Sequence, residues 1–411
     1  MNAKQVVVTG IGVISPNGTG KEAFWKALNA GQSGIKPITL FDVSFFKTKT
    51  AGECTDFKAE DFLGTKGLRN LDRTTTLLCS GVKLALDDAN LQITDENADD
   101  IGVVTATTLS ITSDLAKFTK EQVDEGAQLV NPALFPPTTM NFPSSQLSIR
   151  FKARAFNTTI STGYTAGLDA LKYAIDLIRL GRAQIVLVCG IESFSFSNFT
   201  GFYKIGFLAG LKGPEISCPY DKRHNGIVLG EGTTTLVIEN KEYAQKRKAN
   251  ILAEILSVEN SFDAYKTGKY APKAEGLIQS MTRAIENAEL NTEEIDYICA
   301  SANSVPVQDT LETEAIKKVF KLYSKSIPVS SIKSMIGESV SANGGLQIAA
   351  SIGALKNAVI PPTINFEGNA SGCDLDYVPN SARHESLNNI LINNFGPGGG
   401  NASAIIAKYE E

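Results

Sequence analysis

The chain has 411 residues, of which 43% are apolar and 20% charged, and its formal net charge is −5. This composition is typical of a soluble globular protein with one large core or two ordinary ones. The mild negative charge argues against nucleic acid as a partner, and no apolar run approaches the roughly 20 residues that span a bilayer.

Strand and helix patterns alternate through the first part of the chain. The β-branched run Lys4–Thr9, closed by Gly10, predicts a first buried strand. Further strands are predicted at Ile101–Thr105, Ile185–Val188 and Thr233–Ile238, and helices at Lys21–Ala30, Leu71–Ala89 and Leu168–Leu180. The stretch Leu109–Pro137 is polar, then proline-bearing, and fits neither period.

The same rhythm restarts after Asn250. Strands are predicted at Ile251–Val258, Tyr297–Ala300, Ile327–Val329, Ile390–Asn393 and Ala402–Ala407, and helices at Ala274–Ala288, Thr310–Phe320 and Gly344–Lys356. Such alternation predicts an α/β fold with mostly buried sheets. The repeat indicates an internal duplication into halves 1–250 and 251–411, which we expect to pack as one body because no linker separates them.

The segment Asn157–Gly167 is the strongest local signal. An extended run ends in a turn of small residues and leads into the predicted helix Leu168–Leu180. This arrangement presents a nucleophile in many enzymes, because backbone N–H groups at a helix start stabilise negative charge. Tyr164 occupies the place where a thiol or hydroxyl is expected. A phenol titrates near pH 10, about three units above neutrality, so Tyr164 is a poor acyl acceptor.

Five ordered motifs resemble those of the β-ketoacyl synthases, the condensing enzymes of fatty-acid and polyketide synthesis. The motifs are Val7–Pro16, Ser161–Gly167, the central loop with Pro219–Asp221 and Val228–Gly232, Lys333–Gly337 and Asn393–Asn401. The resemblance runs from end to end. It implies a thiolase-like fold whose duplicated halves form a layered α-β-α-β-α sandwich, an acyl carrier protein as a partner, and no cofactor.

The departures from the family pattern fall on the catalytic positions. The condensing cysteine corresponds to Tyr164, and the two histidines correspond to Ser301 and Glu338. In the family, the cysteine forms the acyl thioester and the histidines polarise the malonyl carbonyl and stabilise the enolate. The second oxyanion donor and the gating phenylalanine fall on Pro397, which has no N–H. We therefore expect no catalytic residue here, and we interpret Tyr164 as filling a vestigial pocket.

Other family positions are expected to serve the fold. The usual acid partner of Lys333 corresponds to Gln347, so we predict that Glu338 pairs with Lys333 instead. Asp309 and Glu312 match acidic positions that organise the surroundings of the site in the family. His224 and Asn225 replace a usual arginine and aspartate, and no family role matches His224, so it is interpreted as non-catalytic.

Two functions of different classes stay open. The first is a non-catalytic chain length factor, a degenerate synthase that pairs with an active ketosynthase in type II polyketide, aryl-polyene or fatty-acid-type systems. The second is an acyltransferase or decarboxylase with altered chemistry, although decarboxylating relatives generally keep their histidines. In the first case Ala155–Ile160 is the expected edge strand of a dimer.

In that dimer, the segment Leu109–Met140 should cross near the acyl tunnel of the partner. Leu109, Leu134 and Phe135 are then candidates to set tunnel depth, the alternative being that they are ordinary core residues. Six cysteines without CxxC spacing indicate reduced thiols, a cytoplasmic location and no metal site.

Overall fold

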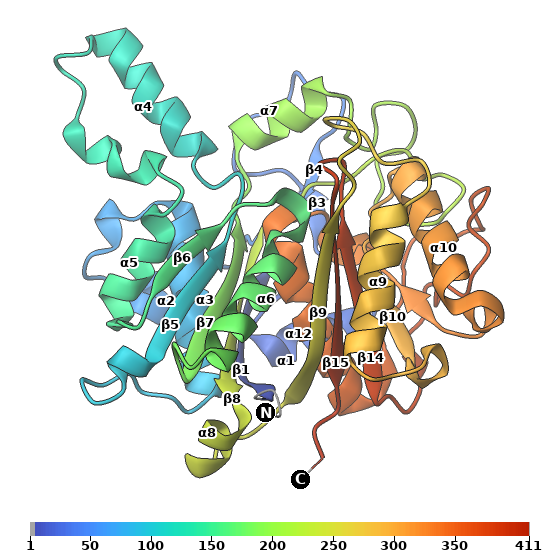
Figure 1. Ribbon diagram of the computed structural model, residues 1–411. Helices are drawn as coiled ribbons and strands as arrows, with labels where there is room; N and C mark the ends of the chain where they lie inside the picture. The colour runs from blue at the N-terminus through green and yellow to red at the C-terminus, as the bar shows by residue number, and fades with distance from the viewer. Residues whose placement is uncertain (1–4, 411) are drawn as a thin grey trace.

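The computed structural model describes residues 5–410, and one sheet runs through the molecule (Figure 1). A first series of strands is β1 (Val6–Ser15), β5 (Ile101–Ala106), β6 (Asn157–Ile160), β7 (Ile185–Glu192) and β8 (Gly232–Asn240). A second series is β9 (Ala253–Phe262), β10 (Tyr297–Cys299), β11 (Val329–Ser330), β14 (Asn389–Phe395) and β15 (Gly400–Ala407). The spatial order is β6-β5-β7-β8-β1-β9-β15-β14-β10-β11, with β2 (Gly18–Thr19) paired to β1.

The two series share one topology. In each, the first strand pairs antiparallel with the fifth and the fifth antiparallel with the fourth. The fourth then pairs parallel with the second, and the second parallel with the third. This repeat agrees with the predicted duplication. The series meet where β1 pairs antiparallel with β9, with Val6 opposite Ile255. The exact division after residue 250 stays a prediction.

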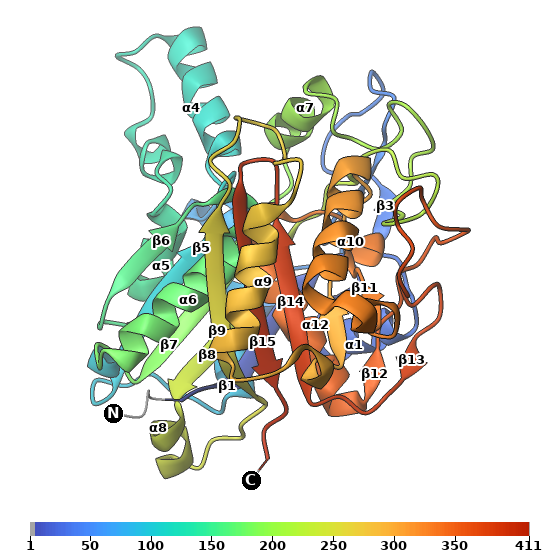
Figure 2. The same ribbon diagram turned by 45° about the vertical axis from the view of Figure 1, so that its right-hand side comes forward.

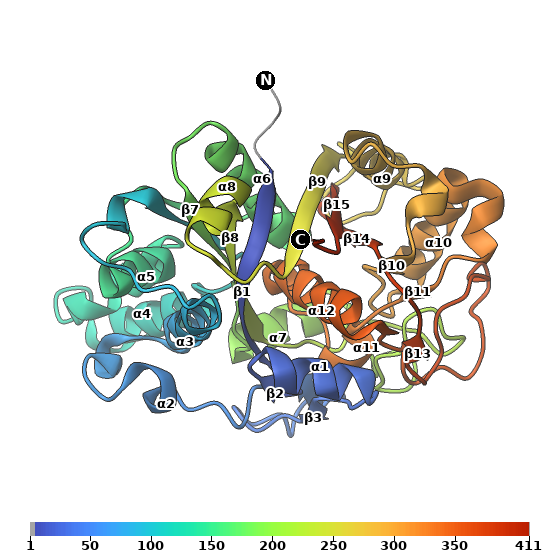
Figure 3. The same ribbon diagram turned by 90° about the horizontal axis from the view of Figure 1, so that it is seen from below.

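Helices complete the layered α-β-α-β-α arrangement that the resemblance implied. The helices α6 (Ala166–Arg179) and α12 (Asn343–Asn357) pack together between the two strand series (Figure 3). The outer layers are α3 (Arg73–Asp88) on the first series (Figure 3), and α9 (Glu275–Asn287) with α10 (Pro306–Phe320) on the second (Figure 2). Within residues 5–410, no helix combines the length and hydrophobicity that crossing a membrane requires.

Shorter elements surround these layers. The remaining helices are α1 (Lys21–Asn29), α2 (Glu60–Leu63), α4 (Thr112–Glu125), α5 (Phe142–Phe151), α7 (Phe196–Lys204), α8 (Lys241–Lys246) and α11 (Lys333–Ile336). Two small sheets pair β3 (Ile35–Pro37) with β4 (Thr50–Gly52), and β12 (Val359–Ile360) with β13 (Arg383–His384).

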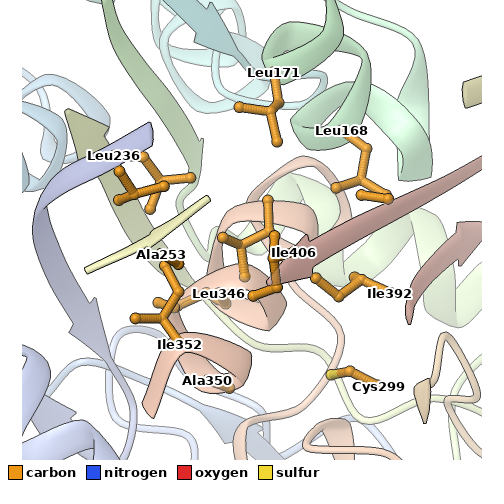
Figure 4. Packing of buried hydrophobic residues seen from close by; sticks show 14 of the residues in the cluster. Leu168, Leu171, Leu236, Ala253, Cys299, Leu346, Ala350, Ile352, Ile392 and Ile406 are labelled. Carbon is orange, nitrogen blue, oxygen red and sulfur yellow. The ribbon is translucent and has the colours of Figure 1, made fainter. Parts of the chain in front are cut away.

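The central core joins side chains from both strand series. Figure 4 shows Leu168 of α6 and Leu346 of α12 among residues from the sheet, including Leu236 of β8 and Ile406 of β15. All four side chains are at most 1% exposed. Burial of each is worth roughly 1.5–3 kcal/mol. Because the two middle helices share one core, the two halves form a single body.

The first strand is longer than predicted. Lys4 lies outside the described residues, and Gly10 does not close the strand, because β1 continues to Ser15. The reason is the approach of α3 to this strand. A Cβ added to Gly12 would lie 1.9 Å from the carbonyl oxygen of Gly81. The glycines of this stretch therefore permit close helix packing and do not mark a turn.

The segment that fits no period forms a projection from the body (Figure 1, upper left). It contains α4, then the short 3₁₀ turns η3 (Pro132–Leu134) and η4 (Pro136–Thr138). We call residues 109–140 the arm. No residue of α4 is buried. Because α4 packs no apolar face against the core, its sequence shows no clear helical period of apolar residues. The predicted edge strand is confirmed, since β6 lies at one end of the sheet.

Candidate functional site

The nucleophile position lies on a short turn between β6 and α6. Gly163, with a φ of 75°, opens a 3₁₀ turn, η5 (Gly163–Thr165), that delivers Tyr164. The aromatic ring of Tyr164 rests on the loop after β14, where a Cβ added to Gly396 would lie 2.4 Å from a ring carbon. Burial raises the pKa of the Tyr164 hydroxyl well above its usual value, and the nearby Glu338 charge raises it further. The phenol is neutral at pH 7 and is not an activated nucleophile.

Lys333 and Glu338 form an ion pair inside the protein, as predicted. The Lys333 Nζ lies 3.1 Å from Oε2 of Glu338, and each side chain is 1% exposed. The ammonium also donates to the carbonyl oxygen of Ser301 at 2.9 Å. Besides Lys333, the carboxylate accepts from Asn303 Nδ2 at 2.7 Å, from a backbone N–H at 2.9 Å and from the Asn343 amide. Four donors fill the lone-pair sites of the carboxylate, so its buried charge is fully compensated.

Ser301 is buried at the end of β10 and its hydroxyl is occupied. The hydroxyl oxygen accepts from the Phe395 N–H and from Nε2 of Gln308, each at 3.2 Å. Its own proton points to the Phe395 carbonyl oxygen at 3.4 Å. These bonds tie the end of β10 to the end of β14. All the hydrogen-bonding groups of the Ser301 side chain are therefore engaged within the protein.

Two buried carboxylates brace the loop that follows Ser301. Glu312 accepts the N–H groups of Ser301 and Ala302 at 2.8 Å each, and the Tyr220 hydroxyl at 2.9 Å. Burial raises the pKa of Glu312, against the lowering effect of these hydrogen bonds. Asp309 accepts the Tyr220 N–H at 2.8 Å and a second backbone N–H at 3.1 Å. Both carboxylates hold backbone groups and so position the loop.

The glycine-rich loop lacks one of its expected donors. Pro397 stands between β14 and β15 and has no N–H, so it offers no hydrogen bond to a developing oxyanion. Gln347, at the position of the usual acid, donates to the carbonyl oxygens of Ala300 at 2.9 Å and Asn393 at 3.1 Å. It acts as a bridge between strand ends, and Lys333 takes Glu338 as its acid.

Sequence reasoning missed three polar residues of this region. Asn303 and Asn343 supply two of the donors to Glu338. Glu192, at the end of β7, accepts a hydrogen bond from the Leu109 N–H at 2.8 Å. It also accepts from the Thr107 hydroxyl and from the Thr108 N–H, each at 3.2 Å. Burial raises the pKa of Glu192 to about 7. The signal for Glu192 was a charged residue directly after the apolar run 185–191.

The arm carries the three tunnel candidates. Leu109 and Leu134 are half-buried, and Phe135 is 57% exposed with its ring 5.9 Å from that of Phe118. The alternative that all three are ordinary core residues is wrong for Phe135. A shallow groove of about 530 Å³ along α4 is lined by the apolar residues Leu115, Ala116 and Val123 and by the polar residues Thr112, Thr119, Lys120 and Asp124. The arm therefore presents apolar surface to solvent.

The positions that the family resemblance assigns to the catalytic groups hold other side chains. Tyr164 is a neutral phenol, the Ser301 hydroxyl is hydrogen-bonded, Glu338 is paired with Lys333, and Pro397 has no N–H. In residues 5–410, no cluster of three or more His, Cys, Asp or Glu side chains is arranged to hold a metal ion. The buried polar and charged groups of this region are hydrogen-bonded to one another.

Comparison with known protein families assigns the chain to one of them. The family models "Beta-ketoacyl synthase, N-terminal domain" and "Beta-ketoacyl synthase, C-terminal domain" match residues 3–244 and 252–367. The chain belongs to the β-ketoacyl synthase family. It is 36% identical over 411 residues to 3-oxoacyl-[acyl-carrier-protein] synthase 2 of Coxiella burnetii, with 99% of each chain covered. It is 34% identical over 426 residues to the tetracenomycin polyketide synthase ketoacyl synthase alpha subunit of Streptomyces glaucescens, covering 99% and 98%.

Solved structures give the same fold. The ishigamide ketosynthase/chain length factor matches with a TM-score of 0.93 and 32% identity, over 99% of this chain and 100% of the other. A ketosynthase from a complex with a type II PKS acyl-carrier protein matches with a TM-score of 0.91 and 25% identity, again over 99% and 100%. The thiolase-like layered fold expected from the sequence is confirmed.

Proposed function

We propose that this protein is a non-catalytic chain length factor that pairs with an active ketosynthase and helps to set product length. The observation that carries the proposal is the filled interior around Glu338. The family resemblance places a catalytic histidine at Glu338, and the Glu338 carboxylate is paired and fully hydrogen-bonded. Its negative charge would repel an enolate, and no neutral donor replaces the lost imidazole.

The exposed arm supports a partner role. Val123 is 77% exposed and Leu129 72% exposed, although both side chains are apolar. Apolar residues gathered on one projection are typical of an interface that is buried in a complex. The unpaired edge of β6 lies on the same half of the protein and offers backbone groups for pairing with a second sheet.

The relatives favour the same family of assemblies. One similar structure is titled a ketosynthase/chain length factor, and another is a ketosynthase with its acyl-carrier protein. We therefore propose an active ketosynthase and an acyl carrier protein as partners in the cytoplasm. Several sequence relatives are named as synthases, so an altered acyltransferase or decarboxylase is the competing proposal. The neutral Tyr164 phenol argues against the acyltransferase, and the lack of a histidine at Ser301 and Glu338 argues against the decarboxylase.

A decarboxylation assay tests the catalytic part of the proposal. The isolated protein is incubated with malonyl-acyl carrier protein, and carbon dioxide release is compared with a heat-killed control. We expect no release above the control, because the enolate-stabilising groups are missing. Release above the control would favour the decarboxylase.

Co-expression with an active type II ketosynthase tests the partner role. Native mass spectrometry should show a one-to-one complex, and product analysis should show longer chains with Leu134→Ala or Phe135→Ala. The control is Leu322→Ala, because Leu322 is 95% exposed and lies outside the arm. A homodimer that leaves ketosynthase products unchanged, or an equal effect of Leu322→Ala, would contradict the proposal.

A further inference from the structure

An aromatic cluster joins α7 to the loop between β3 and β4, residues 38–49, which we call the tip loop. The Phe41 ring lies 5.7 Å from the Phe199 ring of α7, and the Phe46 ring lies 5.0 Å from it. Phe46 also contacts Tyr203 of α7, with ring centroids 4.9 Å apart. Two aromatic side chains of the tip loop therefore anchor it to the helix.

Hydrogen bonds hold the tip loop in shape. At its base, the Ile38 N–H donates to the Lys49 carbonyl oxygen at 2.8 Å. Glu215, in the segment after α7, accepts the Lys49 N–H through Oε1 at 2.5 Å. Within the loop, the Phe46 N–H donates to the Val43 carbonyl oxygen at 3.0 Å. Because the loop is fixed at its base and by its rings, its exposed side chains keep a defined direction.

Phe45 lies between the two anchoring rings in the sequence and projects into solvent. It is 91% exposed, although phenylalanine is usually a buried residue. Phe196 of α7 is 52% exposed with its ring 6.1 Å from that of Phe46, and Ile205 at the end of α7 is 65% exposed. A side chain as exposed as Phe45 occupies no groove of the protein, so this apolar surface is convex.

The charged side chains of this region are mostly basic. The tip loop and residues 193–212 together contain four lysines and one acidic residue, Asp42, whereas the whole chain has a net charge of −5. Exposed lysines are Lys47, Lys49 and Lys204, and within residues 5–410 none of them forms an ion pair. This local excess of positive charge favours an anionic partner.

The arm has the opposite charge pattern. Residues 109–140 contain four acidic residues and two lysines, and the exposed apolar side chains of the arm include the aliphatic Val123 and Leu129. Lysine is depleted in protein–protein interfaces. Exposed aromatic side chains beside lysines are instead typical of proteins that rest on an anionic membrane surface. The tip loop and the arm therefore suit different partners.

We propose that the tip loop and α7 form a contact surface for an anionic lipid bilayer. Phe45, Phe196 and Ile205 enter the headgroup region, and the neighbouring lysines stay at the level of the lipid phosphates. A bilayer accepts a convex apolar surface because it needs no groove on the protein. The contact is peripheral and reversible, since three side chains bury far less apolar surface than a membrane-spanning helix. It does not depend on pairing with a ketosynthase.

Vesicle sedimentation with the full chain tests this proposal. The probes are vesicles of phosphatidylcholine alone and of phosphatidylcholine with about one third phosphatidylglycerol. We expect the protein to bind the anionic vesicles at least about tenfold more tightly than the neutral ones. Added salt should weaken this binding, because it screens the lysines. Binding to neither kind of vesicle, or equally to both, would overturn the proposal.

A substitution at Phe45 locates the apolar part of the contact. Phe45→Ser removes the most exposed ring of the tip loop, and its control is Leu322→Ser, because Leu322 is 95% exposed and lies elsewhere. Phe45→Ser should weaken binding to the anionic vesicles about tenfold, and Leu322→Ser should not. Thermal denaturation verifies that both variants stay folded.

A pair of substitutions locates the charged part. The double variant Lys47→Gln, Lys49→Gln should weaken binding to the anionic vesicles about tenfold. Its control is Lys58→Gln with Lys66→Gln, which changes two exposed lysines outside the region and should leave binding unchanged.

Two results with these variants would overturn the proposal. One is equal binding of all four variants to the anionic vesicles. The other is a Phe45→Ser variant that binds vesicles normally but binds an active type II ketosynthase more weakly, which would assign the surface to a protein partner.

Discussion

The interior around Glu338 and the arm differ in how completely their side chains are satisfied. Glu338 falls where the family resemblance places a catalytic histidine, and it meets four donors inside the protein. Val123 and Leu129 of the arm leave most of their apolar surface in water. The first region needs nothing further to be stable, whereas the second gains burial only against another surface. This difference agrees with our proposal that the interior around Glu338 serves the fold and that the arm binds a partner.

Removing the buried cation should give the largest effect. Lys333→Met leaves the Glu338 carboxylate buried without its partner, which costs about 3–5 kcal/mol. Thermal denaturation should show a clear fall in melting temperature. The double variant Lys333→Met, Glu338→Gln removes both charges and should recover most of the loss.

A matched exposed pair provides the control for that experiment. Lys325 and Asp374 also form an ion pair, but their side chains are 57% and 51% exposed. Lys325→Met should cost less than about 1 kcal/mol, because water screens the pair. If the two lysine variants lost equal stability, Glu338 would not be the compensated interior charge described above.

Glu192 connects the interior to the root of the arm and should show a pH-dependent effect. Its folded pKa of about 7 lies above the ordinary glutamate value of 4.5. The folded state therefore favours the protonated form, and stability falls as pH rises from the unfolded to the folded pKa. Glu192→Gln removes this cost and should stabilise the protein by up to about 3 kcal/mol above neutral pH.

The sign of the Glu192 effect is checked by denaturation at two pH values. The gain in stability from Glu192→Gln should be present near pH 8.5, which lies above the folded pKa of Glu192. It should be absent near pH 4, which lies below the ordinary glutamate pKa. Glu22→Gln is the control, because the Glu22 side chain is 71% exposed. A loss of stability near pH 8.5 would show that the hydrogen bonds from Leu109 and its neighbours outweigh burial.

Charges placed on the arm should weaken pairing but leave the folded chain intact. Val123→Asp with Leu129→Asp puts two carboxylates on a surface that we expect to be buried in the complex. A loss of about 2 kcal/mol or more corresponds to roughly 30-fold weaker association. Analytical ultracentrifugation with the ketosynthase measures it. Leu322→Asp is the matched control, and equal weakening by it would remove the arm from the interface.

Most of the fold could be predicted because apolar periodicity follows burial. The central helix predicted at Leu168–Leu180 is observed at Ala166–Arg179, and the edge position of the strand before it is confirmed. Gly10 was misleading, since a glycine inside a strand can serve helix packing as well as a turn. The arm could not be predicted, because α4 has no buried face to produce a period.

The site was predictable where charge had to be balanced. Lys333 with its usual acid missing left Glu338 as the available carboxylate, and the two form the pair. Asn303 and Asn343 could not be found this way, because neutral amides satisfy a carboxylate without any charge signal in the sequence. Glu192 was missed because its partners are backbone groups and hydroxyls, which every sequence contains.

Restoring the nucleophile alone should have the smallest effect. Tyr164→Cys provides a thiol at the start of α6, but Ser301 and Glu338 still stand where imidazoles are needed and Pro397 still lacks an N–H. When catalytic residues act as a unit, restoring one of them without the others does not restore activity. We expect no condensation by the isolated variant, measured as carbon–carbon bond formation from acyl and malonyl carriers. Thiol alkylation and circular dichroism verify that the new cysteine is accessible and the fold unchanged. Detectable condensation would show that the paired Glu338 region can still stabilise an enolate, and would place the protein among enzymes with altered chemistry.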